Sequence, residues 1–335
     1  MALVLHALPA RCLVRKSEGC LMVDAIQVRP YSPEMRADWN EFLQKSRTPL
    51  FMFERDFMDY HADRFHDASL VFYRGNSMLA VFPANCCDGT VYSHQGLTYG
   101  GLITTVNAKS TDIESAFSVM ATHYRAAGMH SVIYKKVPWC FSVNFCEEDI
   151  YFLHRQGAKL IRRDLSSVID LISRPKLSDS RKNLLKKAAA RSLVCMPLDD
   201  VEVFHALLST ALVKHNAVPV HSPAELQLLS NRFPEKLRLH GVYLDGELLT
   251  AACLFDFGRI VHTQYLAASQ TARQIGAMDY LLETLIHRAT SDGKNFFSFG
   301  ISTEDAGKYL NQGLIAQKEG FGARGLAVDF YEWNL

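Results

Sequence analysis

Apolar residues between residues 262 and 324 recur with two different periods. In residues 277–291 they fall three or four positions apart, the spacing of a helix with one buried face, at Met278, Leu281, Leu282, Leu285, Ile286 and Ala289. The short runs at 262–269 and 296–301 favour strands. Ser302 precedes Glu304 and Asp305, which is typical of a helix N-terminus. The stretch therefore predicts a strand, a turn, a helix, a strand and a second helix.

The polar turn at residues 270–276 is the first candidate binding feature. A helix N-terminus carries unpaired N–H groups and a partial positive charge, which suit a phosphate. Arg273 adds a full charge, and Gly276 would let a ligand approach the backbone. We therefore predict that a donor's phosphates bind at the turn from Arg273 to Ala277.

Strand-like and helix-like patterns alternate through the rest of the chain. Helices are expected at residues 35–46, 111–127, 179–191, 199–212 and 223–233. Strands are expected at residues 25–31, 69–84, 90–105, 130–137, 158–171, 240–254 and 325–335, two of these runs being hairpins. The aromatic residues of residues 50–65, among them Phe53 and Phe57, are expected to be core rather than a ligand cage.

The order of these elements repeats. The hairpin at 69–84 corresponds to the one at 240–254, and the next strands and helices follow in the same order with a nearly constant offset. Two copies of one α+β unit explain this better than a single large sheet. We predict an N-terminal domain at residues 25–165 and a C-terminal domain at residues 166–335. Residues 1–24 form a leader that is expected to be disordered; Met22 is a plausible alternative start, and the segment before it is expected to be dispensable.

Composition limits the classes of function. The chain has 335 residues, of which 48% are hydrophobic and 21% charged, as in an ordinary soluble globular protein. A net charge of +1 argues against a globally basic nucleic-acid binder, although residues 174–191 are locally basic, either as a solvated face or as an anion-binding surface. No apolar run is long enough to span a membrane. The eight cysteines lack metal-ligand spacing and indicate reduced thiols in a cytoplasmic protein without a metal site.

Four sequence blocks carry a resemblance to a known family. They are SHQGLTYGG (93–101), HNAVPVHSPAEL (215–226), HTQYLAAS (262–269) and FGISTEDAGKYLNQGLIAQKEGFGAR (299–324). With the repeated element order they resemble the GNAT acyltransferase fold in its doubled form, as in the Fem-type peptidoglycan aminoacyl transferases. The resemblance implies two tandem GNAT-like (acyl-CoA N-acyltransferase) domains, each a mixed, mostly antiparallel sheet flanked by helices.

The resemblance also implies two kinds of donor. In GNAT enzymes a turn of the form (Arg/Gln)-x-x-Gly-x-(Gly/Ala) holds the pyrophosphate of coenzyme A. Arg273, Gln274, Gly276 and Ala277 lie in the matching turn, whereas Met278 departs at the last position. Fem-type proteins use aminoacyl-tRNA and keep a looser turn. Acetyl-CoA or a longer acyl-CoA is therefore one expected co-substrate, and charged tRNA is the other.

Acyl transfer to an amine needs a polarised carbonyl, an acceptor for the amine proton and a proton for the leaving group. In GNAT enzymes a backbone N–H polarises the carbonyl where two strands separate, and residues 262–269 match that strand. His262 or Glu304 would accept the amine proton, and Tyr265 would protonate the leaving group. Each also has a purely structural interpretation: a strand histidine is often a core residue, and an acidic residue such as Glu304 stabilises a helix N-terminus.

Six further residues are candidates for binding the substrate. His94 and Tyr99 lie in a glycine-rich segment that is either a binding loop or a set of tight turns. His215 and His221 flank a proline-bearing loop and could contact an acceptor. Gln264 shares a strand face with His262, and Lys318 is either functional or half of an exposed ion pair.

The sequence as a whole favours an enzyme that transfers an acyl or aminoacyl group to an amine. The acceptor would be a sugar, a peptide or a cell-envelope precursor bound between the halves, since clefts between domains are common ligand sites. The first half lacks a glycine-rich turn before its helix, so it is expected to shape the acceptor side. The alternative is a non-catalytic ligand-binding protein with a degenerate GNAT fold.

Overall fold

The structure is a computed structural model that describes residues 25–213 and 217–335. The predictions for the leader and for His215 lie outside the described residues. The N-terminal half contains β1 (Ile26–Pro30), α1 (Arg36–Gln44), α2 (Arg55–Met58), β2 (His66–Asp67), β3 (Leu70–Arg74), β4 (Ser77–Phe82), β5 (Asn85–Cys87), β6 (Thr90–Tyr92), β7 (Ile103–Thr104), α3 (Ser110–Ala126), β8 (Ser131–Lys135), α4 (Glu148–Arg155) and β9 (Lys159–Asp170).

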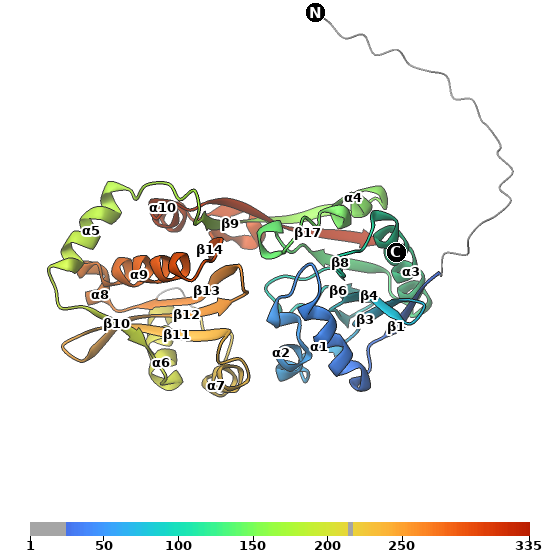
Figure 1. Cartoon of the computed structure of the whole chain (residues 1–335), viewed down its shortest axis with the longest axis horizontal. Helices are drawn as coiled ribbons and strands as arrows, with labels where there is room; N and C mark the ends of the chain where they lie inside the picture. The colour runs from blue at the N-terminus through green and yellow to red at the C-terminus, as the bar shows by residue number, and fades with distance from the viewer. Residues whose placement is uncertain (1–24, 214–216) are drawn as a thin grey trace, which may run out of the picture.

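The C-terminal half repeats this order with longer strands. It contains α5 (Asp179–Ala189), β10 (Val194–Pro197), α6 (Val201–Val213), α7 (Pro223–Arg232), β11 (Leu237–Leu244), β12 (Glu247–Asp256), β13 (Ile260–Ala268), α8 (Gln270–Ile275), α9 (Ala277–Ser291), β14 (Phe296–Ile301), β15 (Thr303–Glu304), β16 (Tyr309–Leu310), α10 (Gln312–Gly320) and β17 (Arg324–Asn334). The two halves lie side by side in Figure 1, with the C-terminal half on the left.

One long sheet runs through both halves. Its strand order is β10-β11-β12-β13-β14-β9-β17-β8-β6-β5-β2, and a second sheet has the order β1-β3-β4-β7. Neighbouring strands are antiparallel except for β13 with β14 and β6 with β8, which are parallel. These two parallel pairs stand at matching places in the two halves. The mixed α+β class, with mostly antiparallel sheets flanked by helices, is confirmed.

The two halves exchange their last strands. β9 follows the N-terminal half in sequence, yet its residues Ser166–Asp170 pair with β14 of the C-terminal half. β17 ends the chain, and its residues Phe330–Asn334 pair with β8 of the N-terminal half. Between these contacts β9 and β17 pair with each other, so that they cross the top of the molecule in Figure 1. The predicted boundary between residues 165 and 166 falls inside β9.

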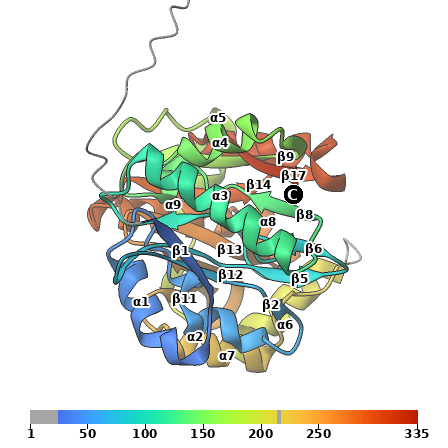
Figure 2. The same cartoon turned by 90° about the vertical axis from the view of Figure 1, so that its right-hand side faces the viewer.

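Three hydrophobic clusters fill the molecule. One lies beneath α9 and one beneath α3, which covers the N-terminal half in Figure 2. The third joins the halves: Phe51 packs on Phe257, with ring centroids 5.2 Å apart. The expectation that Phe53 and Phe57 are core residues is confirmed, because both are buried in this third cluster.

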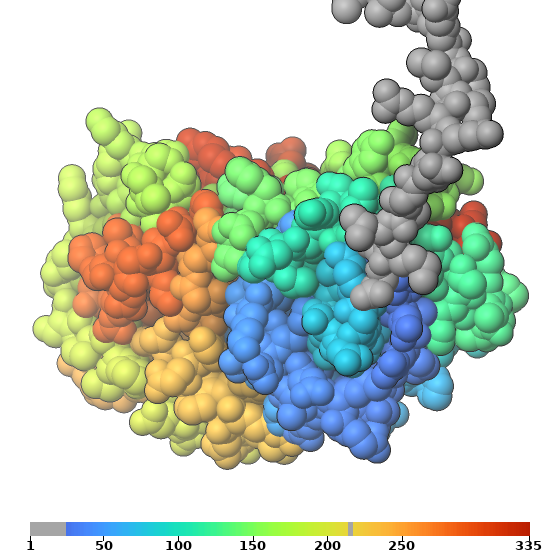
Figure 3. Space-filling model, turned by 45° about the vertical axis from the view of Figure 1, so that its right-hand side comes forward, coloured from blue at the N-terminus to red at the C-terminus, as the bar shows by residue number. Residues whose placement is uncertain are grey.

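The surface between the halves is closed on the side that Figure 3 presents. There the segment around α1 and α2 lies against the gold α7 region. Two polar contacts tie these segments together: Arg64 Nη2 lies 2.5 Å from Glu225 Oε1, and Arg232 Nη1 donates to the Asp56 carbonyl at 2.7 Å. The halves are therefore joined by strands, by a shared core, and at the surface by an ion pair and a hydrogen bond.

Candidate functional site

β13 and β14 stop pairing and separate in the middle of the C-terminal half. They pair only over three residues, the last pair being His262 with Ser298. Each strand also carries an irregularity at this point, where Gln264 of β13 and Phe299 of β14 are left out of the antiparallel ladders with β12 and β9. Bulges bend a strand and redirect side chains. Two cavities lie next to this point of separation.

The first cavity, which we call the C-terminal cavity, has a volume of about 770 Å³. Its walls come from the end of β13 at Leu266, the start of α9 at Met278, β14 at Phe299, and the helices α5 and α10. Arg273 of α8 also lines it. The predicted donor residues thus lie partly at this cavity, while Gln274 is exposed and Ala277 is buried behind the wall.

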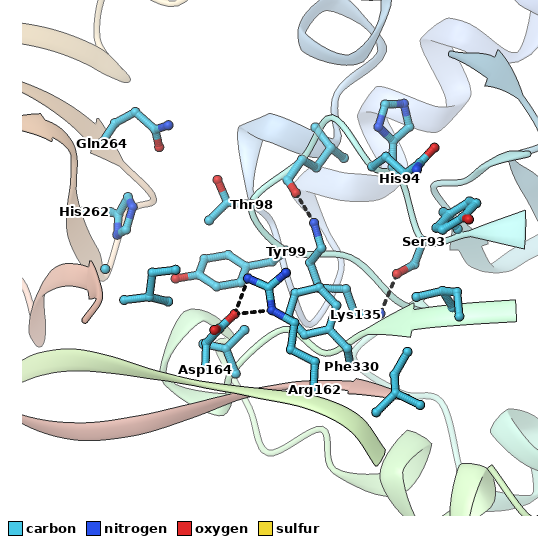
Figure 4. A pocket seen from close by; sticks show the side chains of 18 of the residues that line it. Ser93, His94, Thr98, Tyr99, Lys135, Arg162, Asp164, His262, Gln264 and Phe330 are labelled. Atoms are coloured by element: carbon cyan, nitrogen blue, oxygen red, sulfur yellow. Dashed lines mark hydrogen bonds and ion pairs between the residues drawn. The ribbon is translucent and has the colours of Figure 1, made fainter. Parts of the chain in front are cut away.

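The second cavity, which we call the interdomain cavity, has a volume of about 820 Å³ and lies between the halves. In Figure 4, His262 and Gln264 approach it from the C-terminal half, and Ser93, His94 and Lys135 from the N-terminal half. Phe299 lines both cavities. A molecule in either cavity would therefore reach the same point of the sheet.

His262 lies at the point where the strands separate. Its Nδ1 is 3.0 Å from Ser298 Oγ, and the ring is enclosed by Tyr99, Phe141 and Phe257. Burial, with a contribution from the Lys318 ammonium, lowers the pKa of His262 to about 4. The imidazole is therefore neutral at pH 7 and free of a proton on one nitrogen.

Tyr99 reaches this point from the other half of the chain. In the N-terminal half, the strand that corresponds to β13 is interrupted: β6 ends at Tyr92, β7 begins at Ile103, and the intervening residues form the wall of the interdomain cavity. Tyr99 is 2% exposed, and burial raises the pKa of its hydroxyl, an effect that a hydrogen bond with Ser298 opposes. Tyr99, Ser298 and His262 thus form one polar cluster built from both halves.

Lys318 is buried and lies beneath the separated strands. From α10 its Nζ donates to the carbonyls of Gly300 at 3.0 Å and Ile301 at 2.6 Å, and it lines the C-terminal cavity. Burial lowers the pKa of Lys318 to about 8. The interpretation of Lys318 as half of an exposed ion pair is wrong, because this side chain is 5% exposed.

Tyr265 and His221 contact each other away from both cavities. Tyr265 Oη and His221 Nδ1 share a hydrogen bond of 2.6 Å, and burial raises the pKa of Tyr265 to about 12 and lowers that of His221 to about 4. His221 also stacks with Tyr60, which stacks on His61. This contact places Tyr265 in a polar and aromatic row along the interface between the halves.

The same row ends at His94, which lines the interdomain cavity. The His61 and His94 ring centroids lie 5.3 Å apart, and His94 adopts a left-handed backbone with φ of 62°. Burial lowers the pKa of His94 to about 3, and its Nδ1 is buried without a hydrogen-bond partner. Few non-glycine residues adopt this left-handed backbone, and those that do are concentrated at active and binding sites.

Glu304 lies outside the cavities, and the local structure predicted for it is wrong. The helix expected after Ser302 begins only at Gln312, where the Asn311 side chain accepts from the Leu314 N–H at 2.9 Å. Glu304 instead belongs to the short strand β15, is exposed, and accepts from Asn311 Nδ2 at 2.7 Å. The acidic residues at 304–305 form a small β-turn unit rather than the start of a helix.

The expected phosphate turn is a helix. Residues 270–275 form α8, which is capped by Ser269, and Gly276 follows with φ of 80° before α9 begins. A side chain at Gly276 would collide with the Leu184 carbonyl of α5, so the glycine serves the contact with α5 and leaves no open space for a ligand. Asp279, in the first turn of α9, pairs with Arg181 of α5 at 2.7 Å. This end of α9 is covered by protein.

Several residues of the site were not among the sequence-based candidates. The sequence indicates Ser298 and Phe299 only as part of the strand expected at 296–301, although Ser298 is the one polar side chain in that run and is buried. Lys135 lies in a strand with a second lysine beside it, and Arg162 lies in β9. Their meeting in one cavity follows from the exchange of strands, which the sequence pattern does not reveal.

Two features are absent from the described regions, residues 25–213 and 217–335. No group of three or more His, Cys, Asp or Glu side chains there has the geometry of a metal site. No helix in these regions combines the length and the apolar character needed to cross a bilayer.

One model of a known protein family matches part of the chain. Residues 173–308 match the sequence model described as "Acetyltransferase (GNAT) domain". The matched segment includes β13, α8, α9 and β14, which carry the separated strands. No curated protein matches the chain significantly.

Solved structures share the fold over nearly the whole chain. A crystal structure of FemX has a TM-score of 0.66 at 10% identity and covers 92% of this chain and 97% of its own. The structure of L-PGS from Bacillus licheniformis has a TM-score of 0.60 at 11% identity, covering 90% and 91%. A tandem GNAT protein from the clavulanic acid biosynthesis pathway has a TM-score of 0.51 at 14% identity, covering 92% and 98%. At these identities the likeness shows the fold alone, a tandem GNAT-like fold that FemX also has.

Proposed function

We propose that this chain, with its acetyltransferase (GNAT) domain at residues 173–308, transfers an acyl or aminoacyl group from an activated donor to an amine. The donor would occupy the C-terminal cavity and the acceptor the interdomain cavity. One observation carries this proposal: Phe299, next to the gap where β13 and β14 stop pairing, lines both cavities. A two-substrate transfer needs such a meeting point.

The gap supplies a means of polarising the donor's carbonyl. Past His262, the β13 backbone no longer pairs with β14, and the bulge at Gln264 turns it locally. A free backbone N–H at this point would donate to the carbonyl oxygen of a donor that enters past Leu266. Hydrogen-bond donors aimed at a developing oxyanion are often the largest contribution to catalysis in acyl transfer.

Lys318 would act on the same carbonyl or on the leaving group. Its ammonium is fixed by the Gly300 and Ile301 carbonyls next to the gap, and its pKa of about 8 is close to neutral pH. A group with such a pKa can give and regain a proton efficiently. We therefore assign to Lys318 the role of leaving-group acid, which Tyr265, held by His221, is less well positioned to fill.

His262 and Gln264 would position the acceptor amine. Both line the interdomain cavity, and His262 is neutral at pH 7 because burial lowers its pKa to about 4. This imidazole can accept a hydrogen bond from an uncharged amine, but its low basicity makes it a weak final acceptor for the proton. The proton that the nitrogen loses would instead restore the Lys318 ammonium, after that group has given its own proton to the leaving group. In our proposal Tyr99 and Ser298 complete the polar lining around the attacking nitrogen.

The identity of the donor depends on how it meets the start of α9. Leu184 and the Arg181–Asp279 pair cover that helix end, which disfavours a deeply bound pyrophosphate. Arg273 is exposed at the edge of the C-terminal cavity and remains available to a phosphate, and basic α5 lines another edge. Acyl-CoA and the 3′ end of a charged tRNA are the two donors compatible with this entrance, and the acceptor would be a sugar, a peptide or a cell-envelope precursor.

Calorimetry with single donors tests this assignment. Acetyl-CoA, a longer acyl-CoA and charged tRNA are titrated into the wild type and into Arg273→Ala, with Lys308→Ala as an exposed control. We expect one donor class to bind, and Arg273→Ala to weaken it roughly 10- to 100-fold, the loss of one charge-assisted contact. Equal donor affinity in Arg273→Ala and the wild type would exclude Arg273 as a donor contact.

The covered end of α9 also favours a second candidate, a non-catalytic ligand-binding protein. Such a protein would bind a ligand in one of the cavities without consuming a donor. Binding of acyl-CoA or charged tRNA with no release of thiol or deacylated tRNA, in the presence of amine acceptors, would favour this alternative over transfer.

A further inference from the structure

Lys135 is a cation of the interdomain cavity that has no carboxylate partner. Alternation along β8 sends the neighbouring Lys136 to the opposite face, where its Nζ lies 2.8 Å from Asp149 Oδ1. Lys135 Nζ instead donates to the carbonyl of Leu97. Among the residues that the structure describes, no Asp or Glu oxygen lies within ion-pair distance of it, so two of its three N–H groups remain for a ligand.

Arg162 brings a second cation to the same wall. Its Nη2 lies 2.7 Å from Asp164 Oδ2, and its guanidinium carbon lies 4.5 Å from the centre of the Phe330 ring. Lys135 Nζ lies 5.6 Å from that ring centre, so both cations lie close to the same aromatic ring, Lys135 from β8 and Arg162 from β9. Figure 4 shows Arg162 held by Asp164 on one side, with its remaining edge directed away from that carboxylate.

The charges in the cavity do not cancel. Lys135 and Arg162 face a single carboxylate, Asp164, which is already engaged by Arg162 and by the Thr303 hydroxyl at 2.8 Å. Burial keeps the two histidines of the wall neutral at pH 7, since it lowers the pKa of His94 to about 3 and that of His262 to about 4. The cavity therefore has an excess of one positive charge on the wall that the N-terminal half forms.

An ammonium without a counter-charge in a cavity wall is costly. Burial, aided by the nearby Arg162, lowers the pKa of Lys135 to about 8, so the fold works against its charge. A single hydrogen bond to the Leu97 carbonyl does not require a lysine, because a neutral donor would serve. Groups of this kind, in a cavity and beside a second cation, are more often kept for binding than for stability.

We propose that Lys135 and Arg162 bind an anionic group of the acceptor, a carboxylate or a phosphate, at the wall of the interdomain cavity that the N-terminal half forms. The assignment of that anion to the acceptor rests on the proposed function, whereas the anion site itself does not. Lysine would act as a point charge and the free edge of Arg162 as a planar donor. The acceptor would then span the cavity, with its anion here and its amine at His262 and Gln264.

The test is anion binding to the full-length protein, measured by calorimetry at constant ionic strength. Inorganic phosphate and succinate are the probes for the two kinds of anion. The variants are Lys135→Gln, Lys135→Met and Arg162→Gln, and the control is Lys159→Gln, an exposed lysine at the start of β9. Circular dichroism checks that each variant is folded.

We expect at least one probe to bind the wild type and the Lys159→Gln control equally. Each cavity variant should weaken that probe about tenfold or more, the loss of a charge-assisted contact. The better probe identifies the class of anion. The proposal is overturned if neither probe binds the wild type, or if the folded Lys135 and Arg162 variants bind the probe as well as the control does.

A failure of this inference is distinguishable from a failure of the proposed function. If the probe binds and the variants lose it, but no donor group is ever transferred, the anion site stands and the transfer does not. If transfer occurs with no difference between acceptors with and without an anionic group, and neither probe binds, the transfer stands and the anion site does not.

Discussion

At the residue scale, the site depends on buried groups whose charge the fold controls. His94, His221 and His262 are neutral at pH 7 because burial lowers their pKa values to about 3, 4 and 4. Lys318 keeps a proton below about pH 8, since burial lowers its pKa without removing its two carbonyl partners. The same side chains that carry the chemistry therefore also make stability and activity depend on pH.

Replacing Lys318 with methionine tests its role in the reaction. We expect Lys318→Met to lower kcat about 100-fold or more while donor affinity changes little, because a proton donor acts mainly in the transition state. In the wild type, activity should fall as the pH rises through about 8, where the ammonium is lost. A variant with wild-type kcat, or with raised KM alone, would show that Lys318 only supports the Gly300 and Ile301 carbonyls. Lys308→Met, at an exposed lysine, is the matched control.

The buried histidines predict a loss of stability in acid. Their folded pKa values lie below the unfolded value of about 6.5, so the unfolded chain binds more protons below that pH. The stabilising effect of keeping them neutral is complete above pH 6.5 and is lost as the pH falls toward 4. Between pH 7 and pH 5 we expect the free energy of unfolding in urea to drop by roughly 1–2 kcal/mol for each histidine. A His262→Gln variant should show a smaller drop, and an unchanged pH dependence would contradict this assignment.

At the element scale, the C-terminal half is organised by α9 and the strands that flank it. The helical period of its apolar residues predicts α9 correctly, because Leu281, Leu282 and Leu285 are buried as a stripe. The same reasoning misplaces the start of α10, since Ser302–Asp305 follow a strand with bulges and complete a small β-unit instead. Local patterns identify elements with a continuous buried face, but not how an irregular strand end is used.

Gly276 shows most clearly what the sequence could not supply. A glycine before a helix predicts close approach of some group, yet the group here is the Leu184 carbonyl of α5, which is far away in sequence. The interdomain cavity is likewise formed by residues far apart in sequence, because His262 and Tyr99 come together only when the two halves pack. The fold class could be predicted, whereas the meeting of Lys135 and Arg162 in one cavity wall could not.

Substituting Gly276 therefore tests packing more than donor binding. In the structure there is no room for a side chain at Gly276. A valine at φ of 80° is strained, and its Cβ would displace α5 from α9. We expect the unfolding free energy to fall by about 2–4 kcal/mol, measured by urea denaturation. Wild-type stability in this variant would mean that α5 does not pack on Gly276 in solution.

At the scale of the whole molecule, the reciprocal exchange of β9 and β17 makes the halves depend on each other. The last strand of the chain delivers Trp333, which is 1% exposed, to the core of the N-terminal half, where its ring centroid lies 5.5 Å from that of Phe117. A third core cluster spans both halves. The interdomain cavity can keep its shape only while this connection holds.

Trp333→Ala tests that dependence. Removing a fully buried tryptophan should cost about 3–5 kcal/mol. Because β17 joins both halves, we expect the variant and the wild type each to unfold in one transition when followed by circular dichroism. A second, unshifted transition would show instead that the C-terminal half is stable without its partner.

The measurement that tests the central claim most directly is transfer of a labelled group. Isotopically labelled acetyl-CoA, longer acyl-CoA or charged tRNA is incubated with the protein and a mixture of small amine metabolites, and mass spectrometry follows the label. We predict a labelled amide product with one donor class, which is lost in Lys318→Met and retained in Lys308→Met. The absence of a labelled product with every donor, although a donor binds, would contradict acyl transfer and leave a binding protein with a GNAT-like fold.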